Sequence, residues 1–160
     1  MAETTILRKY ISTIPYKTAL QLSSTVGWVN RLALAIVYIW FGFFKIIHLS
    51  PAQELVSNLH SVTFVRYIPI NIFQVILGYT ECLIGILWLI PKFSKTAFII
   101  FSVHIFTTFL PMFWLPDQTW RSAFILTMTG QYIMKNLVLV ASAVTVFHDY
   151  KKNKSILNLT

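Results

Sequence analysis

Charged residues are scarce in this chain, and acidic ones are the scarcest. Asp, Glu, Lys and Arg together make up 11% of the 160 residues, less than half of the roughly 25% found in soluble domains. So few charges cannot cover a water-exposed surface, which excludes a soluble enzyme and a disordered segment. The hydrophobic residues, 56% of the chain, gather in four runs of about 20 residues, each long enough to cross a bilayer core of about 30 Å. The composition predicts one compact membrane domain.

The chain also lacks cysteine pairs and clustered metal ligands. Cys82 is the only cysteine, and one thiol cannot form an internal disulfide. This excludes a disulfide-rich secreted module and the four-helix thiol oxidases that need a Cys-x-x-Cys pair. We expect Cys82 to be a small core residue. No histidine has another His or Cys three or four residues away, so neither a metal site nor a haem is predicted.

The hydrophobic runs predict an all-α transmembrane four-helix bundle. Its spans are expected at residues 28–48, 70–90, 96–115 and 128–148. Nine Lys and Arg residues fall on the side of the two termini, and only Arg66 and Arg121 fall on the other side. Positive residues favour the cytoplasmic side, so both termini are expected in the cytoplasm. The formal net charge of +8 suits contact with anionic lipid, and no nucleic-acid-binding motif accompanies it.

Three regions follow from these boundaries. Residues 1–27 are expected to form a basic cytoplasmic or interfacial segment without a cleavable signal peptide. Within it, residues 6–14 are expected to form a short helix on the membrane surface. Residues 28–148 form the membrane domain, and residues 149–160 form a basic cytoplasmic tail. The first span is then itself the insertion signal.

A short amphipathic helix is expected between the first two spans. Ser50 is placed as its N-cap, Pro51 as its first helical residue and Gln53 three residues after the cap. The apolar residues that follow fall on one face of such a helix: Ala52, Leu55, Val56 and Leu59. The helix is expected to lie across the outer mouth of the bundle and to end before Pro69.

Within each span, polar and small residues recur at alternating steps of three and four, which places them on one helical face. The four series are Arg31, Ala35, Tyr38, Gly42 and Lys45; Asn71, Gln74, Gly78, Glu81, Gly85 and Trp88; Phe101, His104, Thr108 and Pro111; and Gln131, Lys135, Val138, Ser142 and Thr145. Ionisable residues inside a membrane are costly and usually face the bundle interior with a partner. We therefore expect Lys45, Glu81, His104 and Lys135 to converge, with Glu81 paired to Lys45, to Lys135 or to both.

Two interpretations of this convergence stay open. The charged groups form either an ion-pair network that only fixes helix register, or a cavity that opens to the outer side and holds a small molecule. Two lysines against one glutamate favour an anion, or a quinone whose carbonyl oxygens accept hydrogen bonds. Considered alone, Lys45 is also compatible with a side chain that extends to the membrane interface. His104, considered alone, is compatible with a hydrogen-bonded histidine in the core.

Short motifs in three spans resemble those of the DoxX-like family of small membrane proteins. The matching segments are Gly42-Phe43-Phe44-Lys45 with the following Leu49 to Val56, Gly78-Tyr79-Thr80-Glu81-Cys82-Leu83-Ile84-Gly85, and Gly130-Gln131-Tyr132-Ile133-Met134-Lys135-Asn136. The resemblance covers about residues 28–148. The polar positions of the family carry over as Lys45, Glu81, Lys135 and Asn136, whereas Gln131 stands where many members have Arg.

The resemblance implies a four-helix bundle in the bacterial or archaeal cytoplasmic membrane. Members of the family have been linked to a thiosulfate:quinone oxidoreductase and to oxidative-stress complexes, and relatives in the wider group act as membrane chaperones or maturation factors. Gln131 in place of Arg removes one positive charge from the outer cavity, which weakens the argument for an anionic substrate.

These observations lead to a working hypothesis of a redox-associated inner-membrane subunit that binds a quinone in an outward-opening polar cavity. Glu81 would hold or relay a proton, Lys45 and Lys135 would orient oxygens, and His104 and Tyr79 would line the wall. Electrons would come from another membrane subunit or a bound cofactor. Two alternatives stay open: an assembly or structural subunit without chemistry, in a larger complex or a homo-oligomer, and a small transporter, which four spans without repeats disfavour.

Overall fold

The computed structural model describes the backbone of residues 16–157, and the side chains of 24–152 except residues 64 and 65. The surface helix predicted for residues 6–14 lies outside the described residues. The described chain is mostly helical. Its elements are α2 (Tyr16–Ile46), α3 (Gln53–Val62), η1 (Phe64–Tyr67), α4 (Ile70–Leu89), η2 (Pro91–Phe93), α5 (Ser94–Phe109), α6 (Pro111–Trp114), α7 (Pro116–Thr119), β1 (Trp120–Ser122), β2 (Ile125–Leu126), α8 (Met128–Met134) and α9 (Asn136–Leu157).

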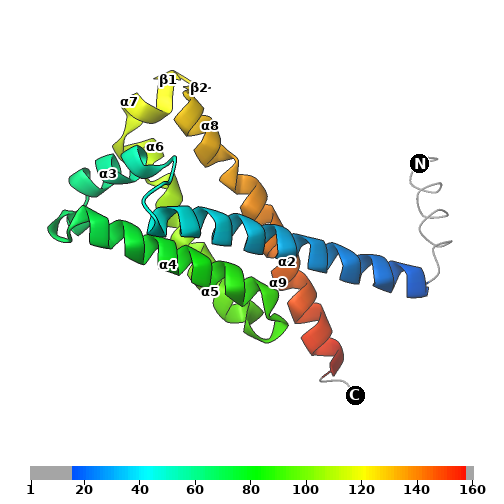
Figure 1. Cartoon of the computed structure of the whole chain (residues 1–160). Coiled ribbons are helices and arrows are strands. Elements are labelled where there is room, and N and C mark those ends of the chain that lie inside the picture. The colour runs from blue at the N-terminus through cyan, green and yellow to red at the C-terminus, as the bar shows by residue number, and fades with distance from the viewer. Residues whose placement is uncertain (1–15, 158–160) are drawn as a thin grey trace.

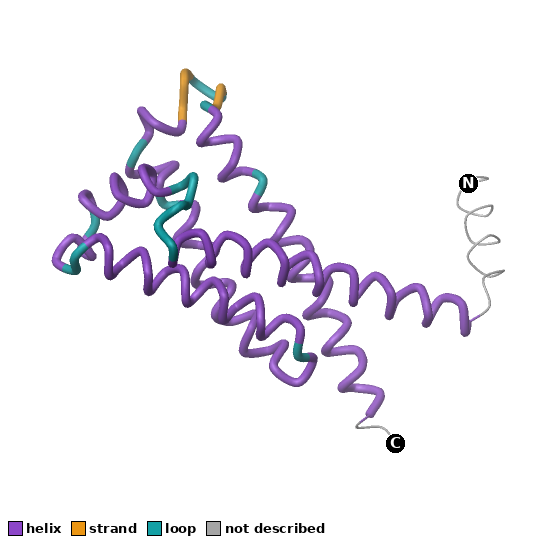
Figure 2. The backbone as a smooth tube through the Cα atoms, viewed as in Figure 1, coloured by secondary structure: helices purple, strands orange, loops and turns teal. Residues whose placement is uncertain are grey.

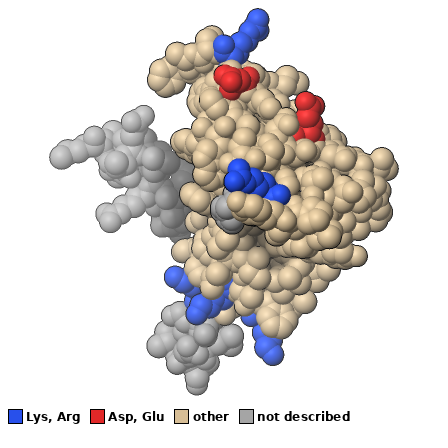
Figure 3. Space-filling view, turned by 90° about the vertical axis from the view of Figure 1, so that its left-hand side faces the viewer, with Lys and Arg blue, Asp and Glu red and all other residues tan. Residues whose placement is uncertain are grey.

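Four helical segments are long and apolar enough to cross a membrane: Ser24–Ile46, Ile70–Leu89, Pro91–Trp114 and Met128–Lys152. They give a multi-pass membrane protein, as the hydrophobic runs predicted. Figure 1 shows that α3, α6, α7 and the β1–β2 hairpin gather at one end of the bundle, here called the hairpin end. The turn η2 and the end of α9 lie at the opposite end, here called the turn end. Most of the surface in Figure 3 is uncharged, and its charged side chains form a few separate groups.

The helices α2 and α4 lie side by side and run in opposite directions (Figure 1). Glycines allow this close approach, because a methyl group built on Gly42 would lie 2.6 Å from the carbonyl oxygen of Gly78. The contact is reciprocal, since a methyl group on Gly78 would lie 2.7 Å from the carbonyl oxygen of Gly42. Gly85 packs in the same way against Ala35. Helices in lipid have no hydrophobic driving force for association. Small residues at such crossings instead allow close van der Waals packing between the helices.

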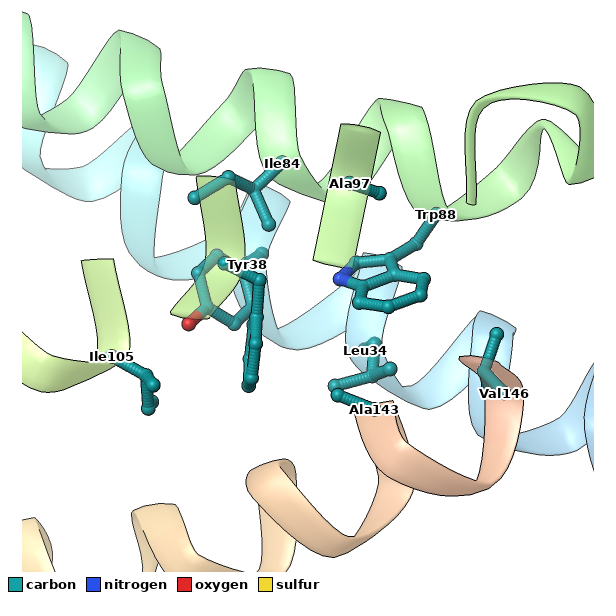
Figure 4. Close-up of a cluster of buried hydrophobic side chains, with 9 residues drawn as sticks. Leu34, Tyr38, Ile84, Trp88, Ala97, Ile105, Ala143 and Val146 are labelled. Atoms are coloured by element: carbon teal, nitrogen blue, oxygen red, sulfur yellow. The ribbon is translucent and has the colours of Figure 1, made fainter. Parts of the chain in front are cut away.

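An apolar core fills the interior toward the turn end. Figure 4 shows its side chains projecting from α2, α4, α5 and α9 toward one another. The fully or almost fully buried members are Leu34, Tyr38, Ile84, Trp88, Ala97, Phe101, Ile105, Ala143 and Val146. Ala97 and Ala143 have no exposed surface, so their helices approach closely. The fourth helix therefore packs through small and branched apolar residues.

The fourth span is not one straight helix. It breaks at Lys135, which separates α8 from α9 (Figure 2). The helix α9 packs against α2 and α5, whereas α8 packs against α7, β2 and α5. Figure 1 shows α8 rising away from α2 toward the hairpin end. The sequence predicted one unbroken helix here because no proline or glycine marks Lys135.

The predicted start of the short helix near the hairpin end is wrong. The helix α3 begins at Gln53 and not at Pro51, and its N-cap Ala52 makes no side-chain capping bond. The Ser50 hydroxyl instead accepts a hydrogen bond from the Ala52 amide at 3.3 Å, which forms a turn before the helix. The segment between the last two spans contains the short antiparallel β1–β2 hairpin, and the described chain is otherwise helices and turns, as predicted.

Candidate functional site

A buried ion pair joins α2 to α4. Lys45 Nζ donates hydrogen bonds to Oε1 and Oε2 of Glu81, at 2.6 and 2.5 Å. The two residues are only 8% and 6% exposed. Taking either charge into a low-dielectric interior is costly unless its partner is present. The two side chains therefore depend on each other.

The Gly42–Gly78 contact explains how these two side chains meet. Lys45 follows Gly42 by three residues, and Glu81 follows Gly78 by three residues. Helical side chains lean toward the N-terminus of their own helix. Because α2 and α4 are antiparallel, both side chains lean back toward the glycine contact from opposite directions. The glycines thus bring the backbones close enough for the ion pair.

His104 and Tyr38 extend the ion pair into a chain of four polar side chains, which we call the polar network (Lys45, Glu81, His104 and Tyr38). Nε2 of His104, from α5, lies 3.2 Å from Oε1 of Glu81. Nδ1 of the same ring lies 3.4 Å from the Tyr38 hydroxyl. A carboxylate only accepts hydrogen bonds, so a neutral His104 carries its proton on Nε2 and accepts from Tyr38 on Nδ1. The network can hold a proton at several adjacent positions.

A second polar contact lies on the hairpin side of the network. Nδ1 of His48 is 3.3 Å from Oε1 of Gln74, and His48 is exposed whereas Gln74 is buried. His48 has a positive φ of 57°, which ends α2 and turns the chain toward α3. Polar groups therefore lie along the interior from the hairpin end to Tyr38.

Lys135 does not join the polar network: of the predicted alternatives, Glu81 pairs with Lys45 and not with Lys135. Glu81 contacts Lys45 and His104, whereas the Lys135 ammonium lies 4.5 Å from the ring centre of Tyr132 on the exposed side of α8. The physical reason is that Lys135 lies on the exposed face of the span, next to α8, which packs mainly against α5, α7 and β2. The site therefore holds one lysine, and the excess positive charge expected from two is absent.

The remaining predicted residues lie elsewhere. Tyr79 is 61% exposed on α4 and does not line the network. Asn136 donates a hydrogen bond from Nδ2 to the Thr108 hydroxyl at 3.1 Å, which ties the start of α9 to α5. Cys82 is partly buried, and its sulfur lies 3.8 Å from the Ile39 carbonyl oxygen. Asn136 and Cys82 therefore have contacts that stabilise helix packing.

Tyr38 and Gln74 are the polar contacts that our choice of site residues missed. Both lie on the predicted interior faces of their spans. The sequence signal for Tyr38 is its position seven residues, or two helical turns, before Lys45 on the same face. Gln74 has the same relation to Glu81. Neutral hydroxyl and amide groups cost less than charges inside a membrane, so the sequence marks them less clearly as interior contacts.

A groove of about 370 Å³ follows the surface of α2 between Leu32 and Phe43 and is bordered by Leu89 of α4. Its lining is almost entirely apolar and includes Trp40. Within the described part of the chain, no three His, Cys, Asp or Glu side chains are grouped so that they could hold a metal ion.

Comparison with protein-family models, curated proteins and solved structures finds no match to this chain. The DoxX-like assignment therefore stays a prediction from the motifs. The site has to be interpreted from its own geometry.

Proposed function

We propose that this protein is a redox-associated membrane subunit that binds a quinone or a similar small molecule beside the polar network. The observation that carries the proposal is the buried Lys45–Glu81–His104 group inside three apolar spans. Ionisable residues retained at such depth are costly, and they commonly belong to proton relays or ligand pathways. A group that only fixed helix register would not need a histidine beside the ion pair.

The chemistry of a quinone matches these side chains. Its two carbonyl oxygens accept hydrogen bonds, and its reduction takes up two protons with two electrons. Lys45 supplies donors for a carbonyl oxygen, and Glu81 and His104 hold protons close by. The electrons come from a partner membrane subunit or a bound cofactor. The apolar groove along α2 suits the hydrocarbon tail of such a molecule.

The proposed location follows from the charge distribution. Both termini lie in the cytoplasm of a bacterial cell, and the hairpin end faces the outer side of the cytoplasmic membrane. In this orientation the amphipathic helix α3 lies across the outer mouth, and the His48–Gln74 contact is the entrance to the network. The DoxX-like motifs support the same membrane and the same class of redox function.

The test is quinone binding by the purified protein. Solvent extraction should release a quinone, and added short-chain quinone should raise the unfolding temperature in detergent. Lys45→Gln should reduce the temperature shift, whereas Lys135→Gln, which changes an exposed lysine, should leave it unchanged. Absence of both extracted quinone and a thermal shift in the unsubstituted protein would refute the proposal.

A second candidate, an assembly subunit without chemistry, is favoured by the aromatic residues at the hairpin end. Phe124 is 96% exposed at the tip of the hairpin, and Phe113 is also exposed. Exposed aromatic residues of this kind anchor protein contacts or an interface. If Phe124→Ser removes a co-purifying membrane protein and no quinone is found, this second function replaces the first.

A further inference from the structure

Tyr38 is the member of the polar network for which the quinone site has no use. It is 4% exposed, and its ring contacts Phe101 and His104 at centroid distances of 5.6 and 5.5 Å. In Figure 4 its hydroxyl points away from Trp88. The phenol therefore lies at the boundary between the apolar core and the polar network.

A proton acceptor already faces this phenol. In its neutral form, with the Nε2 proton donated toward Glu81, His104 presents the lone pair of Nδ1 to the Tyr38 hydroxyl at 3.4 Å. Removing an electron from a phenol makes its proton strongly acidic. A base within hydrogen-bond distance lets the proton leave with the electron, which avoids a high-energy phenol cation in the apolar interior.

Trp88, on the other side of Phe101, lacks such an acceptor. Its ring lies 5.9 Å from that of Phe101, and its buried Nε1 has no hydrogen-bond partner among the described residues. An oxidised Trp88 could not release its indole proton, so it would retain a buried positive charge. An oxidised Trp88 therefore takes an electron from Tyr38 across Phe101, because the phenol proton of Tyr38 can move to His104.

We propose that Tyr38 is a redox-active tyrosine that gives up one electron while its proton moves to His104. The O–H bond of Tyr38 breaks, an N–H bond forms at Nδ1 of His104, and Tyr38 becomes a neutral phenoxyl radical. The oxidant is a strong one-electron acceptor of the peroxyl-radical class. It takes the electron and a proton from water at the membrane surface, becomes a hydroperoxide and leaves hydroxide in that water. The resulting imidazolium lies beside the carboxylate of Glu81, which offsets its charge.

Dense packing around Tyr38 is compatible with this role. A substrate molecule needs a cavity, whereas an electron tunnels across the few side chains between Tyr38 and the lipid. Burial also keeps the radical from coupling to a second tyrosine. The proposal does not depend on quinone binding, because it needs only the Tyr38–His104 hydrogen bond.

The test uses the full-length protein in detergent with a photogenerated ruthenium(III) polypyridyl oxidant. Electron paramagnetic resonance should show a short-lived tyrosyl signal from exposed tyrosines and a long-lived component from Tyr38. Tyr38→Phe should remove the long-lived component, and Tyr79→Phe, which changes an exposed tyrosine, should retain it. Circular dichroism and the unfolding temperature check that each variant is folded.

The positioning role of His104 has a separate readout. His104→Gln should lower the yield of the long-lived radical severalfold and shift its g-anisotropy toward that of a radical without a charged hydrogen-bond donor. A purely structural role would move neither quantity in folded protein. The proposal is overturned if the unsubstituted protein gives no long-lived component or if folded Tyr38→Phe protein retains it, and an unchanged spectrum in His104→Gln overturns the assignment of the proton acceptor. These results do not alter quinone extraction, so the two proposals fail separately.

Discussion

The two halves of the bundle interior are built from different chemistry and from different numbers of helices. The polar half, toward the hairpin end, holds the polar network on α2, α4 and α5. The apolar half, toward the turn end, adds α9. Its buried residues are Leu34, Ile84, Trp88, Ala97, Phe101, Ala143 and Val146. The fourth helix thus contributes to the apolar half and not to the polar network.

The comparison shows what each half requires of its helices. In the apolar half, small residues such as Ala97 and Ala143 let four helices interlock mainly by van der Waals contact. In the polar half, Lys45 and His104 both contact the Glu81 carboxylate, and α8 packs mainly against α5, α7 and β2. Stability in the first half is spread over many contacts, whereas in the second it is concentrated in one charged group. Substitutions should reveal this difference.

The largest effect is expected for Glu81→Gln. This change leaves the Lys45 ammonium buried without a counter-charge, which costs about 3–5 kcal/mol of unfolding free energy. Denaturant unfolding in detergent measures the loss. Adding Lys45→Met should restore most of it, because the double variant buries no unpaired charge. A loss below about 1 kcal/mol in Glu81→Gln would show that the pair is solvated.

A smaller effect is expected in the apolar half. Leu34→Ala removes a fully buried side chain and should cost about 2 kcal/mol, the low end of the range for such cavities, because lipid is as apolar as the core. The same unfolding assay measures it, with Leu32→Ala on the exposed side of α2 as the matched control. Equal losses for both variants would mean that Leu34 is no better packed than a lipid-facing residue.

Gly42→Ala tests the contact that supports the polar half. The added methyl group would lie 2.6 Å from the Gly78 carbonyl oxygen, so α2 and α4 must separate, at a cost of about 1–3 kcal/mol. Because the ion pair depends on this approach, the separation should also weaken the Lys45–Glu81 coupling in a double-mutant cycle. Thr80→Ala, on the exposed side of α4, is the control and should change neither quantity.

The sequence predicted much of the first three spans because their polar and small residues share one face. Arg31, Glu81 and His104 all lie on buried faces, as their spacing of three and four residues indicated. Arg31 donates to the Trp88 carbonyl oxygen at 3.0 Å, a contact that spacing alone does not give. Hydropathy identifies the apolar segments, but it does not predict which polar side chains contact one another inside the bundle.

The fourth span shows why the rest was not predicted. Within the described part of α9 the buried residues are Ala143 and Val146, one position along from the predicted Ser142 and Thr145. The Thr145 hydroxyl donates to the Ala141 carbonyl oxygen of its own helix at 2.9 Å, so this polar residue needs no interior partner. Polarity is therefore a poor guide to the buried face when a side chain satisfies itself locally.

The smallest effect is expected for Lys135→Gln, which tests whether this lysine belongs to either half. Its ammonium lies over the exposed ring of Tyr132, one turn nearer the hairpin end, where it can extend toward the interface. Removing an exposed charge without a carboxylate partner should change the unfolding free energy by no more than about 0.5 kcal/mol. Additivity with Glu81→Gln should hold, because the two residues share no partner among the described side chains. A coupling energy above about 1 kcal/mol would instead place Lys135 in the polar network and remove the distinction between a three-helix and a four-helix half.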